Sequence, residues 1–334
     1  MRILLAVILV SALAWSGYWF LGAQTVERGL SAWLDQRAEE GWIAEYASLD
    51  TAGYPNRFDT TITELELADP ETGVAWTTPF FQILQLSYRP HHVIAVWPDA
   101  QRVSTPNQNI EVTSDVFRGS IEFVPGPALA LSETTVEMAA LSLVSSADWT
   151  GALETGQLSL RATPAAVNSY DVYFAARNLT LPERVRRMAT QSDLVGDVAE
   201  TLAVTATVRF TAPWDRRAIE VARPQVTHID LDLAQGTWGE LDLRFAGELE
   251  VDALGVPTGE ITVKATNWRE MLGLAQQAGW IPANLAPLLE GGLNMVARLS
   301  GNPESIDAPL VFSDGNVTLA GLLPLGPAPL IVLR

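Results

Sequence analysis

Histidine and carboxylate side chains are the residues of this sequence that could hold a metal ion. His91 and His92 are adjacent, so on a strand they point to opposite faces and do not readily chelate one ion. His228 and Asp230 share a strand face at positions i and i+2. Two ligands without a third do not define a metal site, and a solvated strand face is the simpler interpretation of this pair.

Asp230, Asp232 and Gly236 resemble part of a calcium-binding loop. The spacing fails at later positions, where Ala234 and Leu241 stand in place of oxygen ligands. No metal site is therefore predicted.

The remaining patterns do not point to catalysis either. Glu64 and Glu66 could form the acid pair of a glycosidase, but alternating positions on one strand are typical of the solvated side of a sheet. The chain contains no cysteine and no nucleophile-elbow, phosphate-binding or dinucleotide-binding motif. We therefore predict no catalytic residue, no cofactor-binding residue and no enzyme activity.

An apolar run covers residues 3–23, between Arg2 and the next charge at Glu27. At 1.5 Å per residue such a helix spans roughly 30 Å, the thickness of the hydrocarbon core of a bilayer. Because Arg2 is the only flanking positive charge, the N-terminus is predicted inside and the bulk of the chain outside. This indicates a single-pass envelope protein that is anchored through residues 3–23 and whose bulk is periplasmic.

A cleaved signal peptide is the first alternative for this run, and a buried helix of a soluble protein is the second. Two features oppose cleavage: the apolar run is long, and Leu21 stands where a signal peptidase site has a small residue. Trp15, Tyr18 and Trp19 form a candidate aromatic belt near the outer interface. We therefore predict an anchor that stays in place.

The net charge of −18 is spread along the chain. Such a surface repels nucleic acid and anionic lipid headgroups, so neither is an expected partner. The sequence identifies no protein partner.

Beyond the anchor the sequence is rich in alternating apolar and polar residues. The alternation is clear in residues 63–67, 84–88, 157–160, 228–233 and 240–245. A period of two with one polar face predicts antiparallel strands with one covered side. The predicted fold is mainly β: an N-terminal transmembrane helix followed by a long antiparallel, curved or sandwich-like sheet with a few covering helices.

The phase of the alternation predicts where strands are irregular. Ile62, Leu65 and Leu67 are expected on one side, which requires a bulge or a strong twist near Thr63 or Glu64. Strand residues 228–233 keep one phase and should need no bulge.

Helical spacing marks the remaining segments. A short helix is expected after the anchor, up to Gly41, a second in residues 182–202 and a third in residues 267–279. A further short helix should start at Pro282 and carry Leu285, whereas residues 293–299 read as a strand. These elements suggest an anchor in residues 1–24 and two β-rich units, residues 25–202 and 203–334.

Turn-forming motifs are the most distinctive local features. The series Gly53-Tyr54-Pro55-Asn56-Arg57-Phe58-Asp59 predicts a turn that runs into a strand. Asp314-Gly315 between two apolar runs predicts a hairpin. The ending, which includes Pro324, Leu325 and Gly326, is apolar and rich in proline, and is not expected to extend a sheet.

With these motifs the chain resembles a family of Gram-negative envelope proteins known as domain of unknown function 2125. The resemblance rests on the anchor, the Gly53-Tyr54-Pro55-x-Arg57-Phe58-Asp59 turn, the segment ending in Trp97-Pro98, the Asp314-Gly315 hairpin and the Pro324-Leu325-Gly326 ending. Asn56 stands where the family would have an aromatic residue. The chain is also similar in architecture to AsmA-like and TamB-like envelope proteins. That similarity implies an anchored, curved sheet with an apolar groove for lipid chains.

A long sheet with one apolar face must cover that face with helices, close it in a sandwich, or expose it to an apolar ligand. The predicted helices cover little of it, which favours a non-enzymatic protein that binds or guides acyl chains and contributes to envelope lipid homeostasis. The candidate groove residues are Leu231, Leu233, Leu241, Leu243 and Phe245. The alternative is a structural or assembly protein of the periplasm with a closed β core and no lipid ligand.

Overall fold

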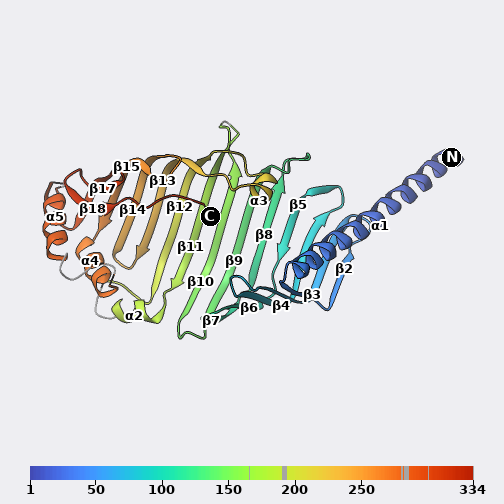
Figure 1. The fold of residues 1–334 in the computed structure, drawn as a ribbon, viewed down its shortest axis with the longest axis horizontal. Helices are drawn as coiled ribbons and strands as arrows, with labels where there is room; N and C mark the ends of the chain where they lie inside the picture. The colour runs from blue at the N-terminus through green and yellow to red at the C-terminus, as the bar shows by residue number, and fades with distance from the viewer. Residues whose placement is uncertain (165, 190–193, 280, 282–285, 300, 334) are drawn as a thin grey trace. The chain divides into compact units, whose positions relative to one another are not determined.

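A computed structural model describes residues 1–164, 166–189, 194–279, 281, 286–299 and 301–333. The described chain is mainly β, with a long N-terminal helix and a few shorter helices, as predicted (Figure 1). It forms two compact units. Unit 1 comprises Met1–Phe123 and Val136–Asp148, and unit 2 comprises Val124–Thr135 and Trp149–Arg334.

Unit 1 contains one long helix and an antiparallel sheet. Its elements are α1 (Arg2–Glu39), β1 (Ile43–Glu45), β2 (Ser48–Ala52), β3 (Arg57–Asp69), β4 (Val74–Leu86), β5 (Arg89–Val96), β6 (Ala100–Thr105), β7 (Gln108–Thr113), β8 (Val116–Phe123) and the second part of β9 (Leu131–Ser145). Strands β1 and β2 both pair with β3, β3 pairs with β4, and β4 pairs with both β5 and β6. Strand β5 also pairs with β8, and β7 pairs with β6 and β9.

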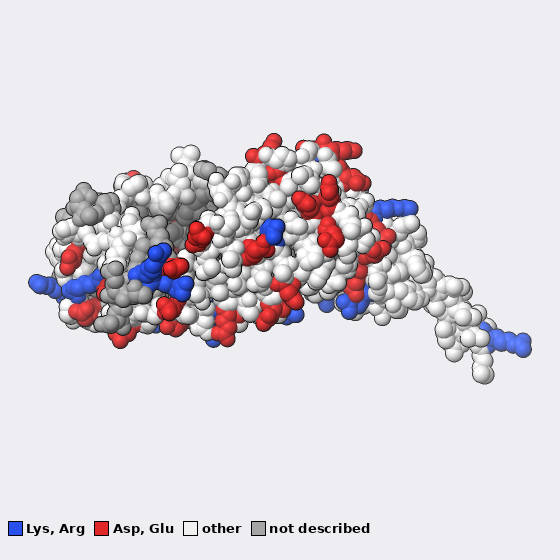
Figure 2. All heavy atoms as spheres, turned by 90° about the horizontal axis from the view of Figure 1, so that it is seen from below, with Lys and Arg blue, Asp and Glu red and all other residues white. Residues whose placement is uncertain are grey.

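The helix α1 is continuous through the predicted anchor and the predicted helix after it. It is long and apolar enough to cross a membrane. Figure 1 shows its N-terminal part extending beyond the strands, and Figure 2 shows that this part carries charge only at its tip. Its C-terminal part packs into unit 1, where Leu34 is buried against Ile62 and Leu65. No loop therefore separates the candidate span from unit 1.

The irregularity predicted in β3 is present. Ile62 and Leu65 are both buried, and Leu67 packs against the same cluster. Glu64 between them has a φ of +49°, which rotates the strand so that residues three apart reach one side. Thus the position of the twist was predicted from the hydrophobic phase.

The described part of unit 2 contains a meander of antiparallel strands and four short helices. Its elements are β10 (Thr150–Ala162), β11 (Ser169–Thr180), α2 (Glu183–Ala189), β12 (Val198–Phe210), α3 (Arg217–Glu220), β13 (Val226–Trp238), β14 (Leu241–Val251), β15 (Pro257–Thr266), α4 (Trp268–Gln277), α5 (Ala286–Leu299), β16 (Ser305–Ser313), β17 (Asn316–Leu319) and β18 (Leu323–Pro327). Each strand from β10 to β17 pairs with the next along the chain.

Three segment predictions in unit 2 are wrong. The helix predicted to reach residue 202 does not, because residues from Val198 onward pair with β11 and β13 as strand β12; the described helix is Glu183–Ala189. The strand predicted at residues 293–299 is the C-terminal part of α5. The proline-rich ending does extend the sheet, since β18 pairs with β17 through a register shift. The helix at residues 267–279 is confirmed as α4, whereas Pro282 and Leu285 lie outside the described residues.

The two units also differ from the predicted division. Residue 202 falls inside β12, which is hydrogen-bonded to its neighbours on both sides. Contacts instead divide the chain at residues 123, 135 and 148.

Candidate functional site

The sheet of unit 2 has one apolar face. Directly paired residues of antiparallel strands lie on the same face, so the register identifies the side chains that share it. Three neighbouring rows across β10 to β16 contain only apolar residues and glycine. We define these rows as the apolar face: Gly156, Ala176, Leu202, Gly236, Leu243, Ala265 and Ile306; Leu158, Phe174, Val204, Ala234, Phe245, Val263 and Ala308; Leu160, Val172, Ala206, Leu231, Gly247, Ile261 and Leu310.

The opposite face carries most of the polar and charged side chains. The row on that face just beyond the third apolar row contains Arg161, Asp171, Thr207, Asp230, Glu248 and Glu260. Arg161 forms an ion pair with Glu133 at 3.1 Å, and Asp171 accepts hydrogen bonds from Thr163 and Thr207. Consequently the sheet of unit 2 is amphipathic, and its apolar face must be covered by other parts of the protein or by an apolar ligand.

Four of the five predicted groove residues lie on the side of the apolar face. Leu231, Leu243 and Phe245 belong to its rows, and Leu241 lies two residues before Leu243 on the same side of β14. Leu233 does not share this face. The structure therefore brings together all of the predicted set except Leu233.

A bulge in β13 accounts for the position of Leu233. Ala206 of β12 pairs with Leu231, whereas the preceding residue of β12, Thr205, pairs with Leu233, so Asp232 is an extra residue. The bulge shifts the alternation and turns Leu233 to the opposite face. The prediction of a strand without a bulge is wrong because the extra residue is visible only against the partner strand.

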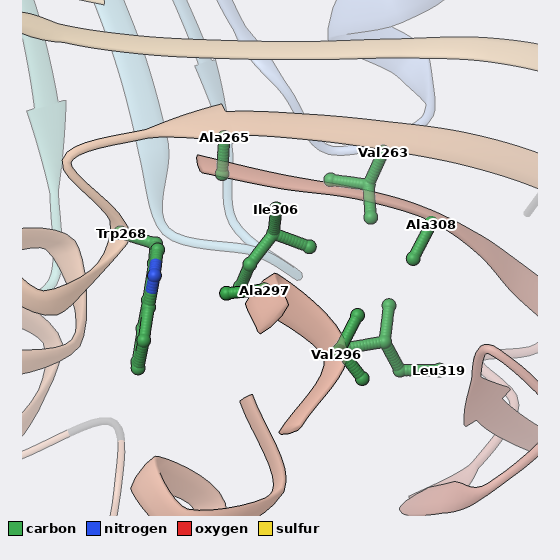
Figure 3. Close-up of a cluster of buried hydrophobic side chains, with 8 residues drawn as sticks. All are labelled: Val263, Ala265, Trp268, Val296, Ala297, Ile306, Ala308 and Leu319. Atoms are coloured by element: carbon green, nitrogen blue, oxygen red, sulfur yellow. The ribbon is translucent and has the colours of Figure 1, made fainter. Parts of the chain in front are cut away.

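Part of the apolar face is closed by helices α4 and α5. Trp268, Val296 and Ala297 are 2 %, 3 % and 0 % exposed and pack against Val263, Ala265, Ile306 and Ala308 of the sheet (Figure 3). Leu243 and Phe245 pack against the same cluster. Leu241 is also buried. The predicted groove residues on β14 therefore belong to a closed core.

On β10 to β12 the apolar face is partly exposed, although Gly156, Ala176 and Ala206 on it are buried. Leu158 is 39 % exposed and Leu202 is 42 % exposed, although both point to the apolar side. Phe174 and Val204 beside them are half-buried. We call these four residues the open patch. Sequence reasoning missed it: the alternation around Leu158 indicated a strand, but Leu202 was assigned to a helix.

A second closed cluster lies at the other ends of these strands. Tyr170 and Phe210 are buried beside Trp214, and the Tyr170 hydroxyl accepts a hydrogen bond from the Trp214 backbone N–H at 2.9 Å. Burial raises the pKa of Tyr170. The adjoining Asp215 accepts hydrogen bonds from the backbone N–H and the guanidinium of Arg217. These bonds, chiefly those from the guanidinium, lower the pKa of Asp215.

The turn motif at Gly53 lies in unit 1, between β2 and β3. The Gly53 carbonyl accepts hydrogen bonds from the backbone N–H groups of Asn56 and Arg57 at 3.2 and 2.9 Å. Gly53 has a φ of +100°, and a Cβ there would lie 2.8 Å from the Arg57 Cβ, so only glycine fits. Arg57 also pairs with Asp59 at 2.9 Å. The predicted turn is thus a compact loop that leads into β3.

This turn packs against α1. The Trp15 indole N–H donates to the Pro55 carbonyl at 2.9 Å, and the Trp19 indole N–H donates to the Arg57 carbonyl at 2.6 Å. Phe58 is 4 % exposed and packs on Trp19. The motif therefore holds the helix against the sheet of unit 1.

The other family-like motif residues have structural positions. Trp97 stacks on Phe117 with ring centroids 4.7 Å apart, and Pro98 beside it is buried. Asp314 and Gly315 have φ values of +50° and +71° and form the predicted hairpin between β16 and β17. Pro324, Leu325 and Gly326 belong to β18.

The histidines that suggested metal chemistry face carboxylates in the structure. His228 Nδ1 lies 2.9 Å from Glu250 of the neighbouring strand, and His91 Nε2 lies 3.9 Å from Glu122. Within the described residues no three histidine or carboxylate side chains come together as a metal site. The absence of enzyme activity stays a prediction.

The sequence was compared with known proteins. The profile of a family described as an uncharacterized protein conserved in bacteria (DUF2125) matches residues 19–329. No curated protein matches the chain, and no solved structure does.

Proposed function

We propose that this chain, which belongs to the DUF2125 family, is a membrane-anchored protein that binds acyl chains of lipids on the apolar face of unit 2. The observation that carries the proposal is the open patch. Leu158 and Leu202 are exposed on a face where the strand register places no polar side chain in three neighbouring rows. Exposed, contiguous apolar surface of this kind is typical of binding sites.

The physical basis is the cost of leaving that surface in water. Burying a leucine or phenylalanine side chain contributes about 1.5–3 kcal/mol, so a ligand that covers the four residues of the open patch gains appreciable free energy. A straight acyl chain suits the site because it has no polar groups that need hydrogen bonds. In this proposal, the protein holds or guides lipid chains and needs no catalytic residue, and it contributes to envelope lipid homeostasis.

The location of the protein is part of the proposal. The helix α1 crosses the inner membrane of a Gram-negative cell, and both units lie in the periplasm. The length and apolar composition of α1 support the span, and Arg2 at its entry side supports the orientation. In this location unit 2 would lie in the compartment that borders the outer leaflet of that membrane.

The alternative is a structural protein whose apolar face is closed. The cluster under α4 and α5 favours this alternative locally, because Trp268 and Ala297 seal part of the face. The lipid-binding proposal predicts that acyl chains contact the open patch, whereas the structural alternative predicts that they do not.

The test is photo-crosslinking in proteoliposomes that contain a phospholipid with a diazirine on one acyl chain, followed by mass spectrometry of labelled peptides. We expect labelled peptides from β10 and β12 in addition to α1, which contacts lipid in either case. Leu202→Arg should reduce labelling of β10 and β12, because it places a charge in the open patch. Leu254→Arg is the matched control, since Leu254 is 75 % exposed in the turn after β14 and outside the apolar face. Labelling confined to α1 would refute lipid binding and favour the structural alternative.

A further inference from the structure

Aromatic side chains of α1 make a second set of contacts with the turn at Gly53. The Tyr54 hydroxyl lies 2.8 Å from Ser16 Oγ, and the Tyr18 hydroxyl donates to the Ser87 carbonyl at 2.6 Å. The Tyr54 ring stacks on Phe20 with centroids 5.7 Å apart. With the two indole bonds described above, the contacts reach from residue 15 to residue 20 of the helix.

The position of these contacts along α1 determines their depth in a membrane. Arg2 is charged and marks the inner boundary of the apolar run. A span of about 20 residues that begins at Ile3 ends near Gly22, so the contacts at Trp15 and Trp19 lie about 5–10 Å inside the outer boundary. A span that begins later along the run would place them deeper.

The hydrogen bonding of the turn suits such an environment. A backbone carbonyl in hydrocarbon costs several kcal/mol unless a protein group satisfies it. The carbonyls of Gly53, Pro55 and Arg57 all accept hydrogen bonds, two of them from tryptophan side chains of the helix. The Asn56 carbonyl accepts the Ser87 backbone N–H at 2.9 Å. These bonds satisfy four of the five carbonyls of residues 53–57 without water.

The outward surface of the same region combines aromatic and aliphatic side chains with the exposed Asn56 and with Arg57, whose charge is paired with Asp59. Tyr54 is 54 % exposed, and Phe20 and Leu21 are 62 % and 68 % exposed. Tyrosine and tryptophan favour the boundary between headgroups and acyl chains. Exposed apolar side chains around a turn with hydrogen-bonded carbonyls, together with a paired arginine, suit the boundary between headgroups and acyl chains.

We propose that the turn formed by residues 53–57 is inserted in the outer leaflet of the membrane that α1 crosses. Unit 1 is then seated on the bilayer through two elements, the helix and the turn. The inference rests on the proposed span of α1 and is independent of lipid binding by unit 2.

The test uses single-cysteine variants of the full chain, which has no native cysteine. Nitroxide-labelled protein in phosphatidylethanolamine–phosphatidylglycerol vesicles is examined by electron paramagnetic resonance, and collisions with oxygen are compared with collisions with a water-soluble nickel chelate. The label at Asn56→Cys tests the turn, because Asn56 is exposed and its hydrogen bonds given above use only its backbone. Val10→Cys reports the middle of the span, and Glu71→Cys reports an exposed turn between β3 and β4.

We expect the ratio of oxygen to nickel collisions at Asn56→Cys to be several-fold above that at Glu71→Cys and closer to that at Val10→Cys. A lipid-like ratio at residue 10 with a water-like ratio at residue 56 would overturn the insertion and leave the span intact. Water-like ratios at both residues would overturn the span as well as the insertion.

Discussion

Replacement of Gly247 by alanine should destabilise unit 2 strongly. Gly247 pairs with Ile261 and has a φ of +146°, and a Cβ there would lie 2.2 Å from the Glu260 carbonyl oxygen. The left-handed backbone costs an alanine about 1–3 kcal/mol. Displacing β15 to relieve the contact costs about 1–3 kcal/mol more, as overpacking of a core does. The free energy of unfolding should therefore fall by roughly 2–6 kcal/mol.

Gly236→Ala is the matched control on the same face. A Cβ at Gly236 meets only Leu202, 4.0 Å away, and Gly236 is not among the residues with positive φ. Alanine there should be neutral or should stabilise the strand by about 0.5–1 kcal/mol, because glycine loses more backbone entropy on folding.

The assay is thermal unfolding of the full chain in detergent micelles, followed by far-ultraviolet circular dichroism. For a unit of this size a loss of 1 kcal/mol lowers the melting temperature by roughly 2–4 °C, so the two variants should differ on the order of 10 °C. Equal melting temperatures would refute the reasoning, because they would mean that neither the φ of Gly247 nor its approach to β15 constrains the sheet.

Two further predictions concern topology and pH. A reporter enzyme that is active only in the periplasm should be active when fused to the C-terminus, because Arg2 favours an inside N-terminus; activity of a cytoplasm-only reporter there would contradict the proposed location. Asp215→Asn should lower the melting temperature at pH 7 and should lower it by less at pH 3. Hydrogen bonds from Arg217 lower the pKa of Asp215 in the folded state, so its stabilising effect is complete above the ordinary pKa near 4 and is lost as the pH falls through the folded pKa. An equal difference between the two proteins at both pH values would show that this carboxylate is not linked to stability.

Alternation predicted strands well wherever one face is polar. The pattern from Glu240 to Phe245 corresponds to β14, and the phase change around Glu64 located the twist of β3. Both signals are contained within a single strand, because burial of one face sets the side-chain period directly.

The predictions that were wrong depend on contacts with neighbouring segments, which the local sequence does not contain. Residues 293–299 fit both a strand and a helix in sequence, and the helix is evident only because Val296 and Ala297 are buried together while Met295 is 55 % exposed. Similarly, Asp232 is recognised as an extra residue only when the pairing of β13 with β12 is known. The open patch was missed for the same reason, since alternation marks an apolar face but the helices that cover it determine which part stays exposed.

If α1 spans the membrane as proposed, its unbroken course would make the protein sensitive to bilayer thickness. A helix accommodates a thinner membrane by tilting. The segment from Gly22 to Glu39 extends about 25 Å beyond the proposed span, so a tilt of about 10° moves its far end by roughly 5 Å. Because Leu34 is fixed in the core of unit 1 and the helix has no break, unit 1 must rotate through the same angle. In the proposed span, a change in membrane thickness would therefore change the inclination of the β-sheet of unit 1.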